Sequence, residues 1–251
     1  MKDDIFYSNM QKAFENFPDD FNILEERIDI ETQLQYFEFV NEIRGKADPA
    51  EVLENSGELF MPETSLDRKK EILSVLSVMD DVKAYRTIEK FIDVSEESPI
   101  KQWAVLALQE SRILLQSSLL DEQQIFISTG LGGKGQKLRY FVVFLNNDKN
   151  FILNKTQQKL LKEELVFELE KNQGEFETID FIEGFSTTLV MLPLKSDIRT
   201  VFKNIIEECN QYGNFLKTDL IVTNVKIMSN SEIIDLLNKK ENYNELEEDL
   251  I

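Results

Sequence analysis

A short glycine-rich and basic stretch is the part of this sequence whose residue types could bind a ligand. The candidate residues are Gly130, Gly132, Gly133, Lys134, Gly135, Lys137 and Arg139. Glycine reaches positive φ at little steric cost, so a cluster of glycines lets the backbone approach another group closely. The three cations stand in a chain whose formal net charge is −19. The stretch therefore predicts a local contact for an anion or for an acidic partner.

Known phosphate-binding motifs fit this stretch poorly. Gly130, Gly132 and Gly135 have the dinucleotide-binding spacing, but that motif needs a helix directly after the glycines. Residues 138–145 are instead β-branched and aromatic, which predicts a strand. A P-loop would need lysine directly after its last glycine, where Gln136 stands. Two interpretations stay open: an exposed, mobile connection within a β-hairpin, and a contact site for an anion or partner.

The composition removes several classes of catalytic chemistry. The chain has no histidine and one cysteine, Cys209. Imidazole bases, zinc sites with histidine or several thiolates, and internal disulfides are therefore impossible. Cys209 shares a helical face with Ile205 and Ile206, which indicates a buried thiol. We find no catalytic motif and no metal-ligand motif, and we expect no cofactor and no enzymatic activity, although a site made of carboxylates alone stays possible.

Residues 1–121 show helical periodicity throughout. Apolar residues recur at helical spacing from Leu34 to Ile43 and from Ile72 to Met79, and Ser98 with Pro99 begins a longer helix. Acidic residues outnumber basic ones two to one in this half. We therefore expect an all-α domain whose acidic surface contacts a basic protein partner.

The helices of this half align with one another at an offset of about 32 residues, a period typical of helical repeats. Asp48 aligns with Asp80, and Leu73 aligns with Val105. Ordinary packed helices would give a similar pattern. The segment from Leu66 to Leu120 resembles HEAT-repeat proteins, because a helix, a short acidic turn, a helix, a longer loop and a helix follow one another. This resemblance implies an α-solenoid with a concave protein-binding face and no catalysis.

Residues 122–240 alternate between strand and helix patterns. Strands are predicted before and after the glycine stretch, at 176–182 and 185–192, and within 216–228, while Asn154 and Ser196 begin helices. The order β-β-α-β-β-α-β-α predicts a mainly antiparallel or mixed sheet with helices packed on it. A ferredoxin-like relative is one candidate. We therefore expect an α+β protein with a helical-repeat domain at 1–121 and an α+β domain at 122–240. The acidic tail at 241–251 is expected to be disordered or to be a short docking segment.

Two functions from different classes follow from these observations. The first is an interaction or scaffold protein without catalytic activity. The alternative is a small-ligand, anion or nucleic-acid-binding module that uses residues 130–139. An exposed aromatic pair on the sheet, such as Tyr140 with Phe126, would favour single-stranded nucleic acid, whereas core positions for both would oppose it.

The charge and the hydropathy of the sequence indicate the cellular location of the protein and the partners that it does not bind. The acidic composition opposes binding to nucleic acid in general and to anionic membranes. No apolar run approaches the roughly 20 residues that span a bilayer, and residues 1–10 lack a secretory signal. Because one cysteine also fits a reducing compartment, we expect a cytoplasmic protein with no membrane contact.

Overall fold

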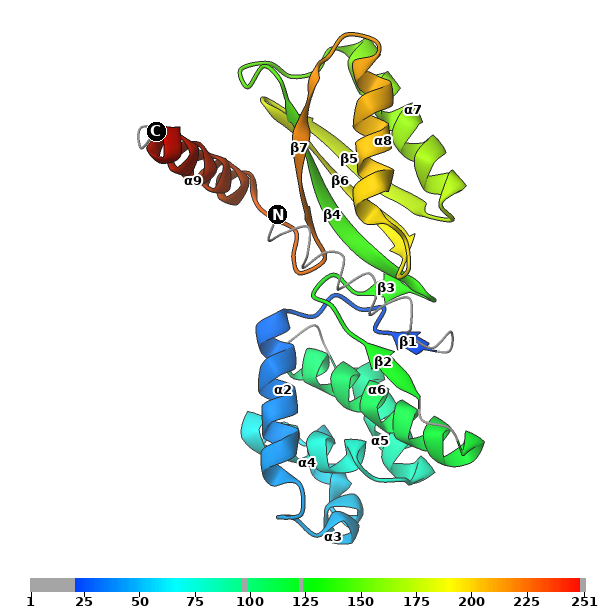
Figure 1. Ribbon diagram of the computed structural model, residues 1–251. Helices are drawn as coiled ribbons and strands as arrows, with labels where there is room; N and C mark the ends of the chain where they lie inside the picture. The colour runs from blue at the N-terminus through cyan, green and yellow to red at the C-terminus, as the bar shows by residue number, and fades with distance from the viewer. Residues whose placement is uncertain (1–20, 96–98, 122–123, 249–251) are drawn as a thin grey trace.

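The computed structural model describes residues 21–95, 99–121 and 124–248 (Figure 1). Helices α2 to α6 form one unit, and the larger sheet with its helices forms the other. Strands β1 and β2 lie between them (Figure 1). The protein is therefore a mixed α and β structure with an antiparallel sheet, as its sequence predicted at that level.

The helical unit contains five α-helices and one short 3₁₀ helix among the described residues. Their bounds are Ile30–Ile43 (α2), Pro49–Glu54 (α3), Ser56–Phe60 (η1), Leu66–Ser77 (α4), Val82–Val94 (α5) and Pro99–Leu120 (α6). Side chains cap four of these helices: Asp29, Asp48, Ser65 and Asp81 each accept a hydrogen bond from a first-turn N–H. Such caps satisfy donors that the first helical turn leaves unpaired.

The packing of these helices does not confirm a helical repeat. In a solenoid each repeat contacts only its neighbours. Here α6 packs against α2, α4 and α5, and α4 also contacts α2 and α3. One shared core results, in which Tyr36, Leu76, Ile88 and Trp103 are buried together. The periodicity that suggested repeats is the apolar spacing that any helix needs when one face is buried.

A small parallel sheet joins the two units. Strand β1 (Phe21–Ile23) pairs with β2 (Ile125–Ile127), although about a hundred residues separate them in the chain. Phe21 and Ile23 are buried in the core of the sheet unit, whereas Leu24 and Ile28 are buried in the helical core. The sequence analysis missed β1 and assigned β2 to a hairpin with the strand after the glycines. Strand β2 pairs with β1 instead.

The main sheet is antiparallel throughout. Its strands are β3 (Gly133–Lys134), β4 (Lys137–Asn146), β5 (Glu175–Ile182), β6 (Phe185–Pro193) and β7 (Leu216–Thr223), and its helices are α7 (Lys155–Lys171), α8 (Ile198–Asn210) and α9 (Asn230–Glu248). The four longer strands lie in the order β7-β4-β6-β5. From β4 to β7 the element order is β-α-β-β-α-β, which is the ferredoxin-like order.

Some element boundaries differ from the sequence prediction. Asp197, not Ser196, caps α8, and its side chain accepts from the N–H of Thr200. The run 216–228 is strand only as far as Thr223. Helix α9 continues through Glu248, so it extends into the segment that we expected to be a disordered tail or a short docking segment. Residues 249–251 lie outside the described ranges. Within those ranges, no helix combines the length and the hydropathy needed to cross a bilayer.

Both faces of the main sheet carry a core. Helices α7 and α8 cover one face, where Tyr140, Val142 and Phe144 are buried. On the other face Phe141, Val143, Leu145 and Phe185 are buried with Leu131 and with Ile233 from α9. Phe126 packs against the helical core instead. Tyr140 and Phe126 are thus core residues and do not form an exposed aromatic pair.

Candidate functional site

Three of the four clustered glycines are buried. A Cβ atom on Gly130 would lie 1.7 Å from the carbonyl oxygen of Val225. On Gly132 it would lie 2.5 Å from the carbonyl oxygen of Glu25, and on Gly133 it would lie 2.1 Å from the carbonyl oxygen of Lys137. Our expectation of an exposed, mobile loop is therefore wrong for these three positions. They are glycines because other backbone segments pack directly against them.

Gly135 differs from the other three. It is exposed, its φ is +58°, and a Cβ atom would meet no atom within 4 Å. It lies in the tight turn between β3 and β4, where Gly133 pairs with Leu138 and Lys134 pairs with Lys137. A left-handed residue in such a turn favours glycine for conformational reasons alone.

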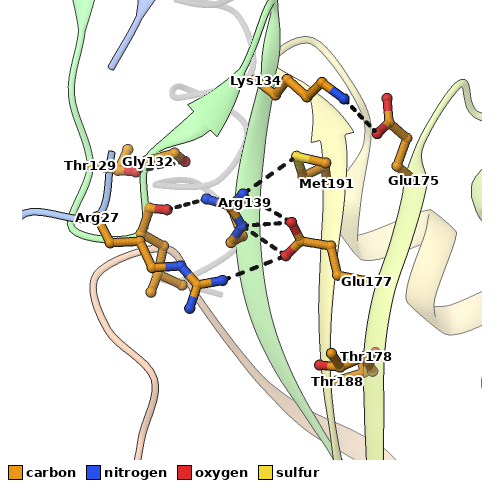
Figure 2. Close-up of polar contacts among 11 residues, drawn as sticks. Arg27, Thr129, Gly132, Lys134, Arg139, Glu175, Glu177, Thr178, Thr188 and Met191 are labelled. Atoms are coloured by element: carbon orange, nitrogen blue, oxygen red, sulfur yellow. Dashed lines mark hydrogen bonds and ion pairs between the residues drawn. The ribbon is translucent and has the colours of Figure 1, made fainter. Parts of the chain in front are cut away.

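The three cations of the glycine stretch are all paired with acids from β5, and Figure 2 shows the pairs of Lys134 and Arg139. Lys137 Nζ lies 2.7 Å from Glu175 Oε1, and Lys134 Nζ lies 4.0 Å from Oε2 of the same carboxylate. The hydrogen bond from Lys137 holds the pKa of Glu175 below its ordinary value. An incoming anion would have to displace this carboxylate, so the arrangement favours a structural role for the two lysines.

Arg139 makes the most extensive contacts of the predicted site residues. Its Nε lies 2.7 Å and its Nη2 lies 2.9 Å from the two carboxylate oxygens of Glu177, a bidentate arrangement. Its Nη1 donates to the carbonyl oxygen of Leu131 at 2.7 Å. Arg27, just before α2, approaches the same carboxylate at 3.8 Å (Figure 2). The structure thus brings the predicted residues together, but they connect β4, β5 and the segment after β1 to one another through ion pairs and hydrogen bonds.

A different set of cations lines a groove on the helical unit. The groove lies between η1 and α5 and has a volume of about 530 Å³. We call it the α5 groove, and its lining residues are Ser56, Gly57, Phe60, Val82, Lys83, Arg86, Thr87 and Lys90. Lys83, Arg86 and Lys90 are spaced by three and four residues, so they share one face of α5. Phe60 and Val82 supply exposed apolar surface beside them.

The cations of the α5 groove are less neutralised than those of the glycine stretch. Within the part of the chain that the structure describes, no ion pair forms at Lys83 or Lys90. The Nζ of Lys90 lies 5.4 Å from the ring centre of Phe60, a cation–π arrangement. Arg86 pairs with Glu89 at 2.6 Å, and the hydrogen bond that Arg86 donates to this carboxylate raises the pKa of Arg86. The groove therefore keeps positive charge in a strongly acidic protein.

Sequence reasoning missed this groove. The signal was present, because three cations at helical spacing lie within a helix that had been assigned correctly from Val82 onward. In the sequence one acid, Glu89, lies between these cations, whereas the glycine stretch has a continuous run without acids. Local charge density in the sequence therefore drew attention to residues whose charges the fold compensates.

A larger hollow of about 910 Å³ lies between α9 and the ends of β4, β6 and β7. Its apolar floor includes Leu145 and Phe185, and several asparagine side chains line its rim. Lys217 and Asp219 both line it, so it combines both signs of charge. This mixture selects no ligand class. In the described ranges, no three acidic or cysteine side chains gather closely enough to hold a metal ion.

Comparisons with known proteins give little information about function. No family model and no curated protein matches the chain. Among solved structures, the chain is similar to one described as "a putative transposase" from Deinococcus radiodurans R1, with 14% sequence identity and a TM-score of 0.34. The similarity covers 44% of this chain and 93% of that chain. A TM-score this low carries no argument about what the chain does.

Two of our expectations are nevertheless corrected by these findings. The resemblance to HEAT-repeat proteins is wrong, because the helices of this chain enclose one shared core and do not stack as successive repeats. The expectation that the chain is not an enzyme is also contradicted, by the description of that similar structure as a transposase. The low TM-score assigns no activity to this chain in its place.

Proposed function

We propose that this protein is an interaction module that binds an acidic, partly apolar segment of a protein partner in the α5 groove. The observation that carries the proposal is the combination of cations on one face of α5 with exposed apolar side chains from η1 and α5. Lys83 and Lys90 have no acidic partner among the described residues, and Phe60 and Val82 lie beside them. A carboxylate-bearing segment would satisfy the cations, and its apolar side chains would cover the exposed carbon.

The expected interaction energies indicate why both the cations and the exposed apolar side chains of the groove are needed. An exposed ion pair contributes only about 0.2–1 kcal/mol, because water and salt screen it. Burial of apolar surface contributes about 25 cal/mol per Å². Covering Phe60 and Val82 therefore adds to the affinity, and salt does not screen this contribution as it screens an ion pair. The cations then mainly set the association rate and the preference for acidic partners. We therefore expect a selective interaction of moderate affinity.

Other partners are less well supported. The glycine stretch as an anion site would need its cations to leave Glu175 and Glu177. Nucleic acid would meet a protein of net charge −19, and Tyr140 is buried beneath helices instead of exposed for stacking. The expectation that the acidic helical surface contacts a basic protein stays a separate prediction.

We place the protein in the cytoplasm as part of the proposal, since its one thiol, Cys209, is free and buried.

Fluorescence anisotropy with labelled acidic peptides tests the proposal. The peptides combine Glu or Asp with Leu or Phe, and their counterparts carry Lys in place of the acids. The triple change Lys83→Glu, Arg86→Glu and Lys90→Glu should weaken binding by at least about tenfold, which is 1.4 kcal/mol. Binding to the unchanged protein should also weaken as salt is raised, because screening shortens the Debye length to about 3 Å at 1 M.

A matched control reverses three positive charges outside the α5 groove. Lys46, Lys159 and Lys203 are exposed lysines outside the groove, each close to an acid one helical turn away. Their reversal to Glu alters the net charge as much as the groove variant does, and it should change peptide affinity by less than about twofold. Equal loss in both triple variants would show that only net charge matters. Failure of every acidic peptide to bind would reject the proposal.

A further inference from the structure

The sequence of this protein itself contains a segment with the chemistry that the α5 groove would recognise. Residues 241–251 contain five acidic residues, no basic residue and four large apolar ones. The segment begins within α9, whose backbone is helical as far as Glu248.

The spacing of the acids matches the spacing of the groove cations. Glu241, Glu245 and Glu248 are separated by four and then three residues. Lys83, Arg86 and Lys90 are separated by three and then four. Residues at such intervals share one side of a helix. Two helices laid antiparallel would therefore bring each acid opposite one cation, because the two spacings coincide when one is read backwards.

The position of α9 decides which copy of the segment can reach the groove. Helix α9 leaves the sheet unit and ends beside it, whereas α5 lies in the helical unit (Figure 1). Within one molecule, the end of α9 therefore lies away from the α5 groove (Figure 1). We infer that the acidic C-terminal segment, residues 241–251, of a second copy of this chain occupies the α5 groove. This inference rests on the proposed function, since it names the partner of the same groove.

The resulting assembly would be heterologous. The groove and the tail are different surfaces, so each copy would offer one groove to a neighbour and one tail to another, as head-to-tail association requires. Two molecules of net charge −19 repel each other, so the contact needs the local positive charge of the groove. Association should accordingly be reversible and dependent on protein concentration.

Sedimentation velocity over a range of concentrations, with the full chain, gives the first test. The average mass of the unchanged protein should rise with concentration. It should stay that of a monomer for the variant that lacks residues 241–251, for the groove-reversed variant (Lys83→Glu, Arg86→Glu, Lys90→Glu) and for the tail-reversed variant (Glu241→Lys, Glu245→Lys, Glu248→Lys). Circular dichroism of each variant checks that it remains folded.

Mixing the two reversed variants gives the deciding test. The mixture pairs the unchanged tail of the groove-reversed variant with the unchanged groove of the tail-reversed variant, and it also offers the acidic groove to the basic tail. The mixture should therefore associate although neither variant associates by itself. The affinity in the mixture should exceed that of either variant alone by at least about tenfold. A mixture that stays monomeric would overturn the inference, and so would self-association that survives deletion of residues 241–251.

The outcomes separate this inference from the proposed function. If a labelled peptide of residues 241–251 fails to bind while other acidic peptides bind the groove, only the second-copy assignment falls. If deletion of the segment strengthens peptide binding while the protein stays monomeric at every concentration, the tail covers the groove of its own molecule, and the assignment to a second copy is overturned. If no acidic peptide binds, both the proposed function and this inference fail.

Discussion

The role of a charged side chain in this protein depends on what the fold places opposite it. Arg139 is mostly buried, and its guanidinium is held by both oxygens of Glu177 and by the carbonyl of Leu131. Breaking such a pair would leave a charge partly buried without compensation, which is costly. Lys90 is exposed and faces an aromatic ring instead. The first side chain organises the fold, and the second is accessible to a partner.

Cys209 is a second case in which burial determines chemistry. The thiol is fully buried on α8, and desolvation together with the nearby Glu164 and Glu208 raises its pKa to about 12. The thiolate is the nucleophilic form, so this residue is unreactive at neutral pH. The interpretation of Cys209 as a buried structural thiol is thus confirmed.

Replacing Gly130 by alanine should destabilise the protein strongly. The new Cβ would lie 1.7 Å from the carbonyl oxygen of Val225, so a backbone segment would have to move. We expect a loss of at least about 2 kcal/mol in the free energy of unfolding, the range of overpacked interiors. Urea denaturation measures it. The control is Gly57→Ala, where the new Cβ would meet nothing within 4 Å, and equal effects of the two changes would contradict this account.

Between elements, single polar residues fix how helices meet. Glu168 on α7 is almost fully buried and accepts hydrogen bonds from Asn204 on α8 and from Lys171 and Asn172 at the end of its own helix. Burial opposes ionisation of this carboxyl, but the hydrogen bonds outweigh it, and its pKa is lowered from the ordinary value. A buried carboxylate with several donors is thus the link that sets α7 against α8.

Glu168→Gln should reduce stability and change its dependence on pH. Because the folded pKa lies below the unfolded one, the stabilisation by this carboxylate is present above the ordinary pKa near 4.5 and is lost as pH falls through the lowered folded value. We expect a loss of about 1–3 kcal/mol at pH 7, typical of hydrogen bonds to a charged group, and a smaller loss in strong acid.

Thermal unfolding at pH 7 and at pH 3 measures the effect of this change. Glu163→Gln is the control on the same helix, because Glu163 is exposed and its one ion pair within the described ranges is with Lys159 at 3.7 Å. That control should alter stability by less than about 0.5 kcal/mol at either pH. A Glu168 variant that behaves like the control would mean that the α7–α8 contact does not depend on the carboxylate.

At the scale of the whole molecule, the segment from Phe21 to Ile28 holds the two units together. Its first residues are buried in the sheet core and its last in the helical core, and the N–H of Leu24 donates to the carbonyl of Ile127. A division of the chain at 121/122, which the sequence suggested, would leave β1 on one fragment and β2 on the other. Whether both fragments fold is still a prediction to be tested.

Separate expression of residues 1–121 and 122–240 tests this junction. We expect the sheet fragment to show weaker amide protection in β2 and in the nearby part of β4 than the intact chain, since the buried side chains of β1 are missing. Addition of a peptide of residues 19–29 should restore that protection, whereas a scrambled peptide should not. Hydrogen exchange with mass spectrometry measures both. Full protection of the fragment alone would show that the sheet unit does not need β1.

Features set by neighbours in the chain could be determined from the sequence. The capping box that Asn154 forms with Gln157, the cap at Asp48 and the turn at Gly184 involve residues two to four positions apart, so residue type and spacing decide them. The alternation of apolar residues likewise predicted β4, β5 and β6, because a strand must bury one face.

Only the tertiary structure decided the features that depend on distant segments. Lys137 and Arg139 lie 38 residues from the acids that pair with them, and β2 lies about a hundred residues from β1. The same cluster of glycines fits an open binding loop and a tightly packed crossing of backbones. Only the positions of the backbone at Glu25, Lys137 and Val225 distinguish the two. Local spacing fixes hydrogen bonds within a helix or turn, but the partners of a buried glycine or a cation depend on how the whole chain packs.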